Sequence, residues 1–368
     1  MKTNIRDIFK EFAVMGDFIS ASPYGSGHIN DTYAAVCSQA GLQVRYIFQR
    51  INHNIFKDPA ALMDNVARVT RHCRGKLACD DADASRKTLT LVKTRDNADY
   101  FIDGQGYYWR CYLFIENAKT YDVPKTEQQI YQAAKAFGNF QAMVCDLGGK
   151  PLNETIPDFH NGPKRYRTFL EAVDADKCNR AAGAGPEIDK INAFSHIFDV
   201  LPALVAGGKI PMRITHNDTK INNVMIDDNT GDGICVIDLD TVMPGLALYD
   251  FGDMVRTTVS PTAEDETNLD LVGLQMPRFE AVLKGYLATA GGFLNKAEKE
   301  NLILSGKMIT LMIGVRFLTD YLSGDTYFKI HRPNHNLDRC RTQIKLVESI
   351  TSQELQLGRL VADVLKNG

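Results

Sequence analysis

The segment Ile214-Thr-His-Asn-Asp-Thr-Lys-Ile-Asn-Asn-Val-Met-Ile226 organises this chain. Within it, Lys220 follows Asp218 by two positions and Asn223 follows it by five. Its apolar end begins a predicted β-hairpin, whose polar turn contains glycine and whose second strand ends at Asp238. The pattern predicts a loop that carries a carboxylate, an ammonium and an amide, beside a hairpin that delivers another carboxylate.

These four groups match the chemical needs of phosphoryl transfer. A carboxylate such as Asp218 orients an acceptor hydroxyl and takes its proton. Asn223 and Asp238 offer the hard oxygen ligands that Mg²⁺ prefers, and Lys220 offers a positive charge to the transferred phosphate. Taken singly, Asp218 is as consistent with a loop cap, and Lys220 with a solvated lysine. Their joint spacing favours Asp218 and Lys220 as catalytic residues.

Further acidic residues follow the hairpin. Asp240 either contacts the metal, directly or through another ligand, or holds the strand end through backbone hydrogen bonds. Asp250-Phe251-Gly252 spells the metal-binding motif of protein kinases. Because Asp238 already holds the strand-end position that a metal ligand needs, we expect Asp250 and Asp253 to cap a helix or brace a loop.

Gly25, Ser26 and Gly27 lie between two predicted strands near the N-terminus. Glycines let backbone N–H groups approach phosphates, so a hairpin lid over a nucleotide is favoured over a plain turn. Asn30 replaces a third glycine and no helix follows, which argues against a dinucleotide-binding fold. His28 on this lid contacts phosphate or acceptor, or is structural; the sequence leaves these open.

The order of the predicted elements indicates an α+β chain of two lobes. Residues 1–116 form a small antiparallel β-rich lobe and residues 117–368 a larger, mainly helical lobe, with a ligand cleft between them. Asp58-Pro59 opens a helix inside the first lobe. We expect strands at 19–24, 28–37, 43–50, 89–92, 100–102 and 109–115, and later helices at 125–147, 162–182, 187–207, 264–290, 296–325 and 339–366.

The connector Phe114-Ile115-Glu116 offers backbone groups to the edge of an adenine ring, by its position alone. Arg316 lies in a strongly apolar segment, where an arginine needs a partner. It either pairs with Asp320 one helical turn later or presents a donor fork to substrate hydroxyl or carbonyl groups.

Composition narrows the class. The chain has 368 residues, 44% of them apolar and 24% charged, as in an ordinary globular protein of two lobes. Its net charge of -3 gives no support for nucleic acid or an acidic membrane as a partner. Charges interrupt the most apolar segment, and the first residues lack a signal-like apolar core. We expect a cytoplasmic protein with small-molecule partners; the oligomeric state stays open.

Motifs along the chain resemble those of the aminoglycoside phosphotransferase and choline kinase superfamily, which has a protein-kinase-like fold. Within it the chain is most similar to the N-acetylhexosamine 1-kinases. The matching segments are Tyr24–Tyr33, Thr215–Lys220, Ile237–Thr241, Met243–Gly245, Asp250–Asp253, Arg316–Tyr321 and Thr342–Leu346.

The resemblance implies ATP- and Mg²⁺-dependent phosphorylation of the anomeric hydroxyl of N-acetylglucosamine or N-acetylgalactosamine. It also implies that His28, Asp218 and Arg316 contact the sugar. The alternatives are a kinase for another small alcohol, such as choline or an aminoglycoside, and a nucleotide-binding protein without activity.

One departure from the kinase pattern concerns the strand that normally carries a phosphate-binding lysine. Gln49 holds that place, and Arg50 alternates to the opposite face. Either Gln49 contacts phosphate as a neutral donor, or the lid and Mg²⁺ carry more of the charge.

Overall fold

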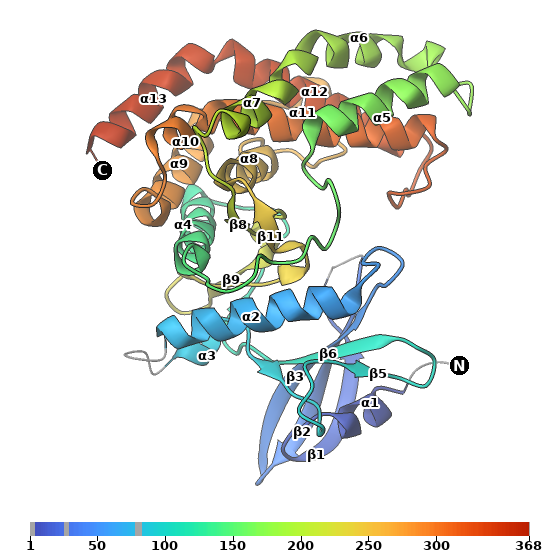
Figure 1. Cartoon of the computed structure of the whole chain (residues 1–368), viewed down its shortest axis with the longest axis vertical. Helices are drawn as coiled ribbons and strands as arrows, with labels where there is room; N and C mark the ends of the chain where they lie inside the picture. The colour runs from blue at the N-terminus through green and yellow to red at the C-terminus, as the bar shows by residue number, and fades with distance from the viewer. Residues whose placement is uncertain (1–3, 26–28, 78–82, 368) are drawn as a thin grey trace.

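The computed structural model describes residues 4–25, 29–77 and 83–367. The chain forms two lobes stacked along its long axis, one rich in β-strands and one helical (Figure 1). This confirms the predicted α+β architecture, with a small antiparallel sheet in the first lobe and a larger helical second lobe. The predicted lid residues Ser26, Gly27 and His28 lie outside the described residues.

Segments of alternating apolar residues form the sheet of the first lobe, in the order β1-β2-β3-β6-β4 with β5 paired to β6. All of these pairs are antiparallel, and each strand overlaps a segment predicted to be extended. Ala40 and Gly41 adopt positive φ in the tight turn between β2 and β3. The strands are β1 (Asp17–Pro23), β2 (Asp31–Gln39), β3 (Leu42–Ile51), β4 (Leu91–Val92), β5 (Phe101–Ile102) and β6 (Tyr108–Leu113).

The two faces of this sheet have different partners. Helix α1 (Ile5–Glu11) packs on one face, where Phe48 and Trp109 are fully buried. Successive residues of a strand point to opposite faces. Gln49 and Arg110, which pair across β3 and β6, therefore point to the other face, toward the second lobe.

Helix α2 (Pro59–Leu77) lies between the lobes (Figure 1). Asp58 caps it, since Oδ1 accepts a hydrogen bond from a first-turn N–H at 2.9 Å, which confirms the predicted helix start. Its buried Asn65 donates from Nδ2 to the carbonyls of Asn153 at 2.8 Å and Val242 at 3.0 Å. Helix α2 is thereby tied to the second lobe.

Short strands position the predicted catalytic loop. The hairpin of β9 and β10 is present as predicted, β8 pairs with β11, and β7, just after the first lobe, pairs with β9. The loop lies between β8 and the 3-10 turn η3 (Ile221–Asn223). These strands are β7 (Ala118–Lys119), β8 (Arg213–Thr215), β9 (Val224–Asp227), β10 (Gly233–Val236) and β11 (Met243–Gly245).

Helices α4 (Glu127–Val144) and α9 (Met276–Ala290) approach closely at two glycines. A Cβ atom on Gly285 would lie 2.2 Å from the Tyr131 carbonyl oxygen, and one on Gly138 would lie 2.7 Å from a backbone oxygen of α9. Both distances are shorter than any real contact. The glycines therefore set the separation of this helix pair.

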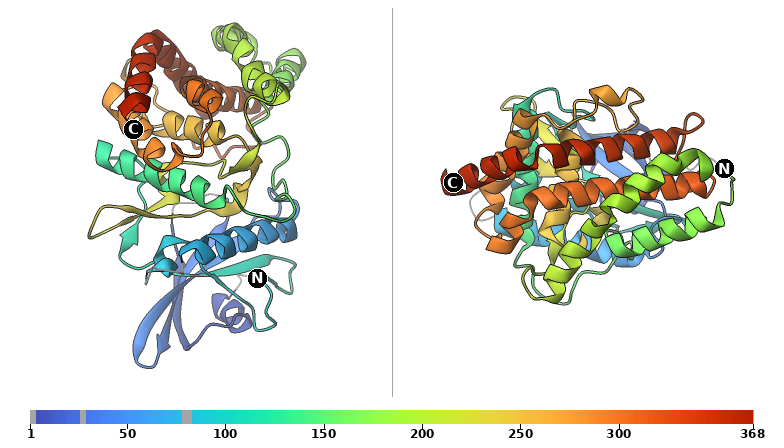
Figure 2. Two further views of the ribbon diagram at one scale, coloured as in Figure 1. Left: turned by 60° about the vertical axis from the view of Figure 1, so that its left-hand side comes forward. Right: turned by 90° about the horizontal axis from the view of Figure 1, so that it is seen from above.

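Helix α11 (Leu302–Leu322) is long and apolar enough to cross a membrane by length and composition. Its most apolar window is 72% buried inside the protein. It packs against α5 (Gly162–Ala175), α8 (Ala247–Thr258) and α12 (His335–Ser352), and the C-terminal helices lie side by side across this lobe (Figure 2). The burial is that of a central core helix.

Several predicted helices are shorter than expected. The pattern over 187–207 is interrupted by the 3-10 turn η2 (Ser195–Asp199), and that over 264–290 is helical only from Met276, where a proline occupies the first turn. Helix α8 was not among the predicted helices, and its N-cap residue, Leu246, offers no side chain that could cap it. The remaining helices are α3 (Ala84–Lys87), α5 (Gly162–Ala175), α6 (Gly185–Phe194), α7 (Val200–Ala206), α8 (Ala247–Thr258), α10 (Lys296–Glu300), α12 (His335–Ser352) and α13 (Glu354–Asn367).

Candidate active site

Asp250 fixes the backbone just before Asp218. Its carboxylate accepts the N–H of His216 at 2.9 Å and that of Asn217 at 2.7 Å, and it also accepts from Gln141. Asn217 has a φ of 66°, a conformation that asparagine tolerates better than most residues. The side chain of Asp250 is fully buried and its oxygens are occupied. This confirms the prediction that Asp250 braces a loop.

Asp253, one turn later on α8, fixes the backbone just after Asp218. Its Oδ2 accepts the N–H of Thr219 at 2.9 Å, and its Oδ1 accepts from Arg256 Nε at 2.8 Å. The Thr219 hydroxyl donates to the Asp250 carbonyl at 2.6 Å. Helix α8 therefore grips the loop on both sides of Asp218 and leaves that side chain facing outward.

Asp218, Lys220 and Asn223 are brought together as the spacing suggested. Lys220 Nζ lies 2.9 Å from Asp218 Oδ1, and Asn223 Nδ2 donates to Asp218 Oδ2 at 3.1 Å. Burial raises the pKa of Asp218, but the positive charges of Lys220, His216 and Arg256 lower it by more than burial raises it. The pKa of Asp218 therefore lies below its ordinary value. Asp218 is thus an ionised acceptor at neutral pH.

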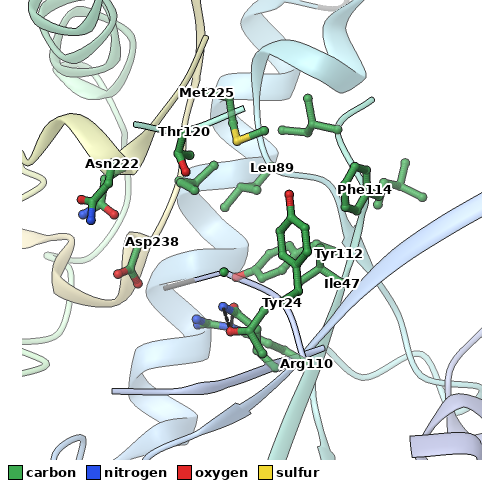
Figure 3. Close-up of a pocket in the computed structure, with 17 residues that line it drawn as sticks. Tyr24, Ile47, Leu89, Arg110, Tyr112, Phe114, Thr120, Asn222, Met225 and Asp238 are labelled. Atoms are coloured by element: carbon green, nitrogen blue, oxygen red, sulfur yellow. Dashed lines mark hydrogen bonds between the residues drawn. The ribbon is translucent and has the colours of Figure 1, made fainter. Parts of the chain in front are cut away.

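Asp238 ends the hairpin with a φ of 58°, and its carboxylate faces the cavity (Figure 3). His216 Nε2 lies 2.9 Å from the Ile237 carbonyl oxygen, which ties this end to the Asp218 loop. The side chain reaches the solvent of the cleft, yet the surrounding protein and the carboxylates of Asp240 and Asp218 raise the pKa of Asp238 to about 7. Negative charge is crowded here, and a cation relieves it.

The donor set fits magnesium better than a metal that needs a protein cage. Asn223 uses its Nδ2 toward Asp218, which leaves Oδ1 without a donor among the described residues. Within those same residues no group of three or more His, Cys, Asp or Glu side chains is placed to hold a metal. One amide oxygen and the Asp238 carboxylate, completed by phosphate and water, is the coordination that Mg²⁺ commonly takes.

Asp240 has partners that neither sequence alternative included. Its Oδ1 pairs with Arg110 Nη1, and its Oδ2 accepts from Asn30 Nδ2 at 2.6 Å. Both partners belong to the first lobe. Asp240 therefore joins the two lobes through side chains, and its two oxygens are already engaged.

Arg110 is the site residue that the sequence reasoning missed. It is 1% exposed, and its Nε donates to Gln49 Oε1 at 3.0 Å, while Gln49 Nε2 donates to Thr32 Oγ1 at 3.0 Å. A signal was present, since Arg110 lies in an apolar strand segment just as Arg316 lies in an apolar helix. Only the β3–β6 register places Arg110 beside Gln49.

A cleft between the lobes opens in front of these groups (Figure 3). Its empty volume is about 970 Å³, including solvent at the mouth, and its position between two lobes is a common one for ligand sites. Of the predicted nucleotide-binding residues, Gly25, Gln49, Phe114 and Ile115 line it. The predicted metal ligands Asn223 and Asp238 also line this cleft, as do Asn222, Met225 and Arg110.

The connector contributes unevenly to this cleft. The Ile115 backbone N–H and carbonyl have no hydrogen-bond partner among the described residues, as an adenine edge would require. Glu116 does not line the cleft: its carboxylate pairs with Arg45 and its carbonyl accepts from Arg86 at 3.0 Å. The structure therefore places Glu116 outside the predicted nucleotide site.

Arg316 does not pair with Asp320. The Asp320 carboxylate instead accepts the backbone N–H groups of residues 326, 327 and 328 at 2.8–2.9 Å, and also Asn336 Nδ2 at 2.9 Å. The Arg316 guanidinium lies 5.2–5.7 Å from the ring centroids of Phe159, Tyr327 and Phe328. The alternative that Arg316 forms an i,i+4 ion pair with Asp320 is thus excluded.

Two arginines near the His160 side of the catalytic loop are not held by salt bridges within the described residues. Arg316 and Arg165 form no ion pair with a carboxylate anywhere in the described part of the chain. Burial lowers the pKa of both, and Arg165 Nε is buried with no hydrogen-bond acceptor among the residues that the structure describes. Both line a second cavity together with Tyr327.

His160 and Phe159 connect this cluster to the catalytic loop. His160 Nε2 lies 3.0 Å from the Asn217 carbonyl oxygen, next to Asp218, and its ring packs against Tyr249. The adjacent Phe159 presents its face to Arg316. The backbone next to Asp218 is therefore linked to Arg316 through His160 and Phe159.

The sequence profile of the phosphotransferase enzyme family, APH, matches residues 20–282. The chain belongs to this family. The matched region contains the whole Asp218 loop, the hairpin and α8, and it ends within α9, before α11 and Arg316.

Solved structures of small-alcohol kinases share the fold over most of the chain. An aminoglycoside phosphotransferase from Alicyclobacillus acidocaldarius aligns with a TM-score of 0.61 at 13% identity, over 97% of this chain and 95% of that one. A spectinomycin phosphotransferase with ADP and spectinomycin gives 0.58 at 13%, over 95% and 97%. An ethanolamine kinase from Plasmodium vivax gives 0.52 at 13%, over 93% and 84%.

Proposed function

We propose that this chain is a kinase that uses ATP and Mg²⁺ to phosphorylate the anomeric hydroxyl of an N-acetylhexosamine, N-acetylglucosamine or N-acetylgalactosamine. The observation that carries the reaction type is the convergence of Asp218, Lys220 and Asn223 in one loop, with Asn223 and Asp238 lining the interlobe cleft. Family membership supports the same class of reaction.

Each group has one role in this proposal. Asp218, held ionised by Lys220, accepts a hydrogen bond from the acceptor hydroxyl and takes its proton as the phosphoryl group is transferred. Lys220 balances the charge that develops on the transferred group. Asn223 Oδ1 and Asp238 would hold Mg²⁺, which when bound neutralises the phosphate oxygens.

The cleft suits a nucleotide. The unpaired backbone groups of Ile115 match the edge of adenine, and Phe114 and Ile47 supply apolar walls. Gly25 borders the same cleft on the side of the predicted lid. A related phosphotransferase was crystallised with ADP, which supports the same assignment here.

The acceptor is inferred from charge. Choline and aminoglycosides are cations, and they are recognised by aromatic cages or acidic rims. Here the aromatic cluster of Phe159, Tyr327 and Phe328 already surrounds a cation of the protein, Arg316, which repels such acceptors. A neutral sugar with an amide carbonyl suits a guanidinium donor and aromatic faces. The resemblance of the Arg316 segment to sugar kinases agrees with this choice.

A panel of acceptors tests the proposal. The enzyme is incubated with ATP and Mg²⁺ and with N-acetylhexosamines, unacetylated hexoses, choline and an aminoglycoside, and kcat/KM is taken from ADP release. The proposal expects the N-acetylhexosamines to be the best substrates and both cations to be inactive. Turnover of a cation alone would establish the other small-alcohol activity, and nucleotide binding without turnover of any acceptor would indicate an inactive protein.

A further inference from the structure

The phosphate end of the cleft has an unusual source of charge. Protein kinases place a lysine on the third strand and pair it with a glutamate of the following helix. Here Gln49 occupies that strand position. The α2 residue Met63 contacts a different cation, Arg110 of β6, with its sulfur 4.0 Å from Arg110 Nη1. Arg50 points away and pairs with Asp31 on the other face.

Arg110 occupies the vacant role from the neighbouring strand. It lies directly across the β3–β6 ladder from Gln49, and it lines the same cleft as Asp238. In Figure 3 its guanidinium nitrogens extend from the sheet toward Asp238. Nε is held by Gln49 and Nη1 by Asp240. The second terminal nitrogen, Nη2, has no acceptor among the described residues.

A second polar group beside it also lacks a partner. Tyr112, two residues along β6, lines the same cleft and is 3% exposed. Its hydroxyl is buried and has no hydrogen-bond partner in the part of the chain that the structure describes, and its ring lies 5.4 Å from the Arg110 guanidinium carbon. Buried polar atoms are rarely left unpaired unless a ligand or water completes them. Both unpaired donors border one region of the cleft.

We propose that Arg110 supplies the positive charge of the nucleotide phosphate subsite in place of the usual strand lysine, with Asp240 and Gln49 holding its guanidinium in position. This inference rests on the nucleotide dependence in the proposed function. Because Asp240 lies on the second lobe and Arg110 on the first, the subsite is assembled across the lobe interface.

The alternative is that Arg110 only links the two lobes through Asp240. Comparing a ligand that carries phosphates with one that does not distinguishes this structural role from a contact with phosphate. The affinities of ADP and adenosine are measured by calorimetry without any acceptor, for the wild type, Arg110→Gln and Arg110→Lys. We expect Arg110→Gln to weaken the affinity for ADP by roughly 10-fold or more, which is the effect of losing hydrogen bonds to a charged group. Adenosine affinity should change less than about 2-fold.

Rescue and control variants sharpen this test. Gln49→Lys in the Arg110→Gln background restores a cation from β3 and should recover most of the ADP affinity. Arg110→Lys keeps the charge and should lie between the wild type and Arg110→Gln. Arg50→Gln, one residue away on the opposite face, should leave both affinities unchanged.

An equal loss of affinity for ADP and adenosine, or no change in either affinity, would overturn the inference. If Arg110→Gln does not fold, the same comparison is made with the charge-conserving Arg110→Lys variant. These measurements need no sugar. A wild type that binds ADP but transfers nothing to N-acetylhexosamines refutes the proposed acceptor alone. A sugar kinase whose Arg110→Gln variant binds ADP normally refutes the role of Arg110 alone.

Discussion

Arg110 and Arg316 are two arginines in apolar surroundings, and they differ in what holds them. Arg110 is paired to Asp240, whereas Arg316 forms no ion pair with a carboxylate among the described residues and lies against aromatic rings and the Tyr327 hydroxyl. An arginine without a carboxylate is available to a ligand. We therefore expect the two arginines to respond differently to substitution.

Arg316→Ala is expected to raise KM for the sugar by roughly 10-fold or more, as for a lost hydrogen bond from a charged donor, with little change in KM for ATP. Initial rates at varied sugar and varied ATP measure this split. Arg359→Ala, which removes an exposed arginine of α13 outside both cavities, is the matched control and should leave both values near those of the wild type. An unchanged sugar KM in Arg316→Ala removes this residue from the acceptor site.

Asp238 and Asp250 are expected to respond differently to substitution. Asp238→Ala should abolish the Mg²⁺ dependence of ADP binding, because it removes the carboxylate that faces the cleft. Asp250→Asn should keep that dependence and lower the melting temperature, because Asp250 is buried against the loop backbone. ADP titrations with and without Mg²⁺, together with thermal melts, check both. Loss of Mg²⁺ dependence only in Asp250→Asn would reverse the assignment.

At the scale of elements, the close approach of α4 and α9 depends on glycine. Gly285→Ala should destabilise the protein by about 1–3 kcal/mol, since the new Cβ meets the Tyr131 carbonyl at 2.2 Å and the helices must separate. Gly292→Ala is the matched control, because a Cβ there meets nothing within 4 Å. Chemical denaturation of both variants measures the difference. Equal stabilities would show that the helix spacing relaxes at no cost.

The hairpin is tied to the first lobe by Arg86 and Asp227, which form a 2.6 Å ion pair. The Arg86 hydrogen bond, with the N–H groups of Thr230 and Asn229, lowers the pKa of Asp227 to about 2. A depressed folded pKa stabilises the protein above the ordinary pKa of Asp, about 3.9, and this contribution is lost as pH falls toward 2.

Asp227→Asn should therefore lower the melting temperature by the same amount at pH 7 and pH 5, and the gap to the wild type should narrow at pH 3. Melts across this range measure the gap. A gap that is independent of pH would show that the charge of Asp227 is not what links the hairpin to α3.

At the scale of the whole molecule, local sequence explains part of the site. Asp218, Lys220 and Asn223 lie within six residues, and the hairpin that carries Asp238 follows at once, so spacing alone predicted their convergence. The Asp250 brace was also predicted, because Asp238 already filled the strand-end position. These inferences need only one loop and one hairpin.

Other features depend on contacts between distant segments. The pairing of Arg110 with Asp240 requires both the β3–β6 register and the stacking of the lobes. Arg316 loses Asp320 as a partner because the loop after α11 folds back onto that carboxylate. Neither event leaves a periodic pattern in the sequence. The sequence therefore predicted the loop, but it did not indicate Arg110 and it left the partner of Arg316 open.

The reaction and the role of Asp218 can be tested together by phosphorus NMR of wild type and Asp218→Asn with ATP, Mg²⁺ and an N-acetylhexosamine. The wild type is expected to form a sugar 1-phosphate as ADP accumulates. Asp218→Asn should form it about 10²- to 10⁴-fold more slowly, the usual contribution of a general base, while binding ADP as well as the wild type does. Absence of a sugar 1-phosphate from the wild type, or an undiminished rate from Asp218→Asn, would contradict the proposed function.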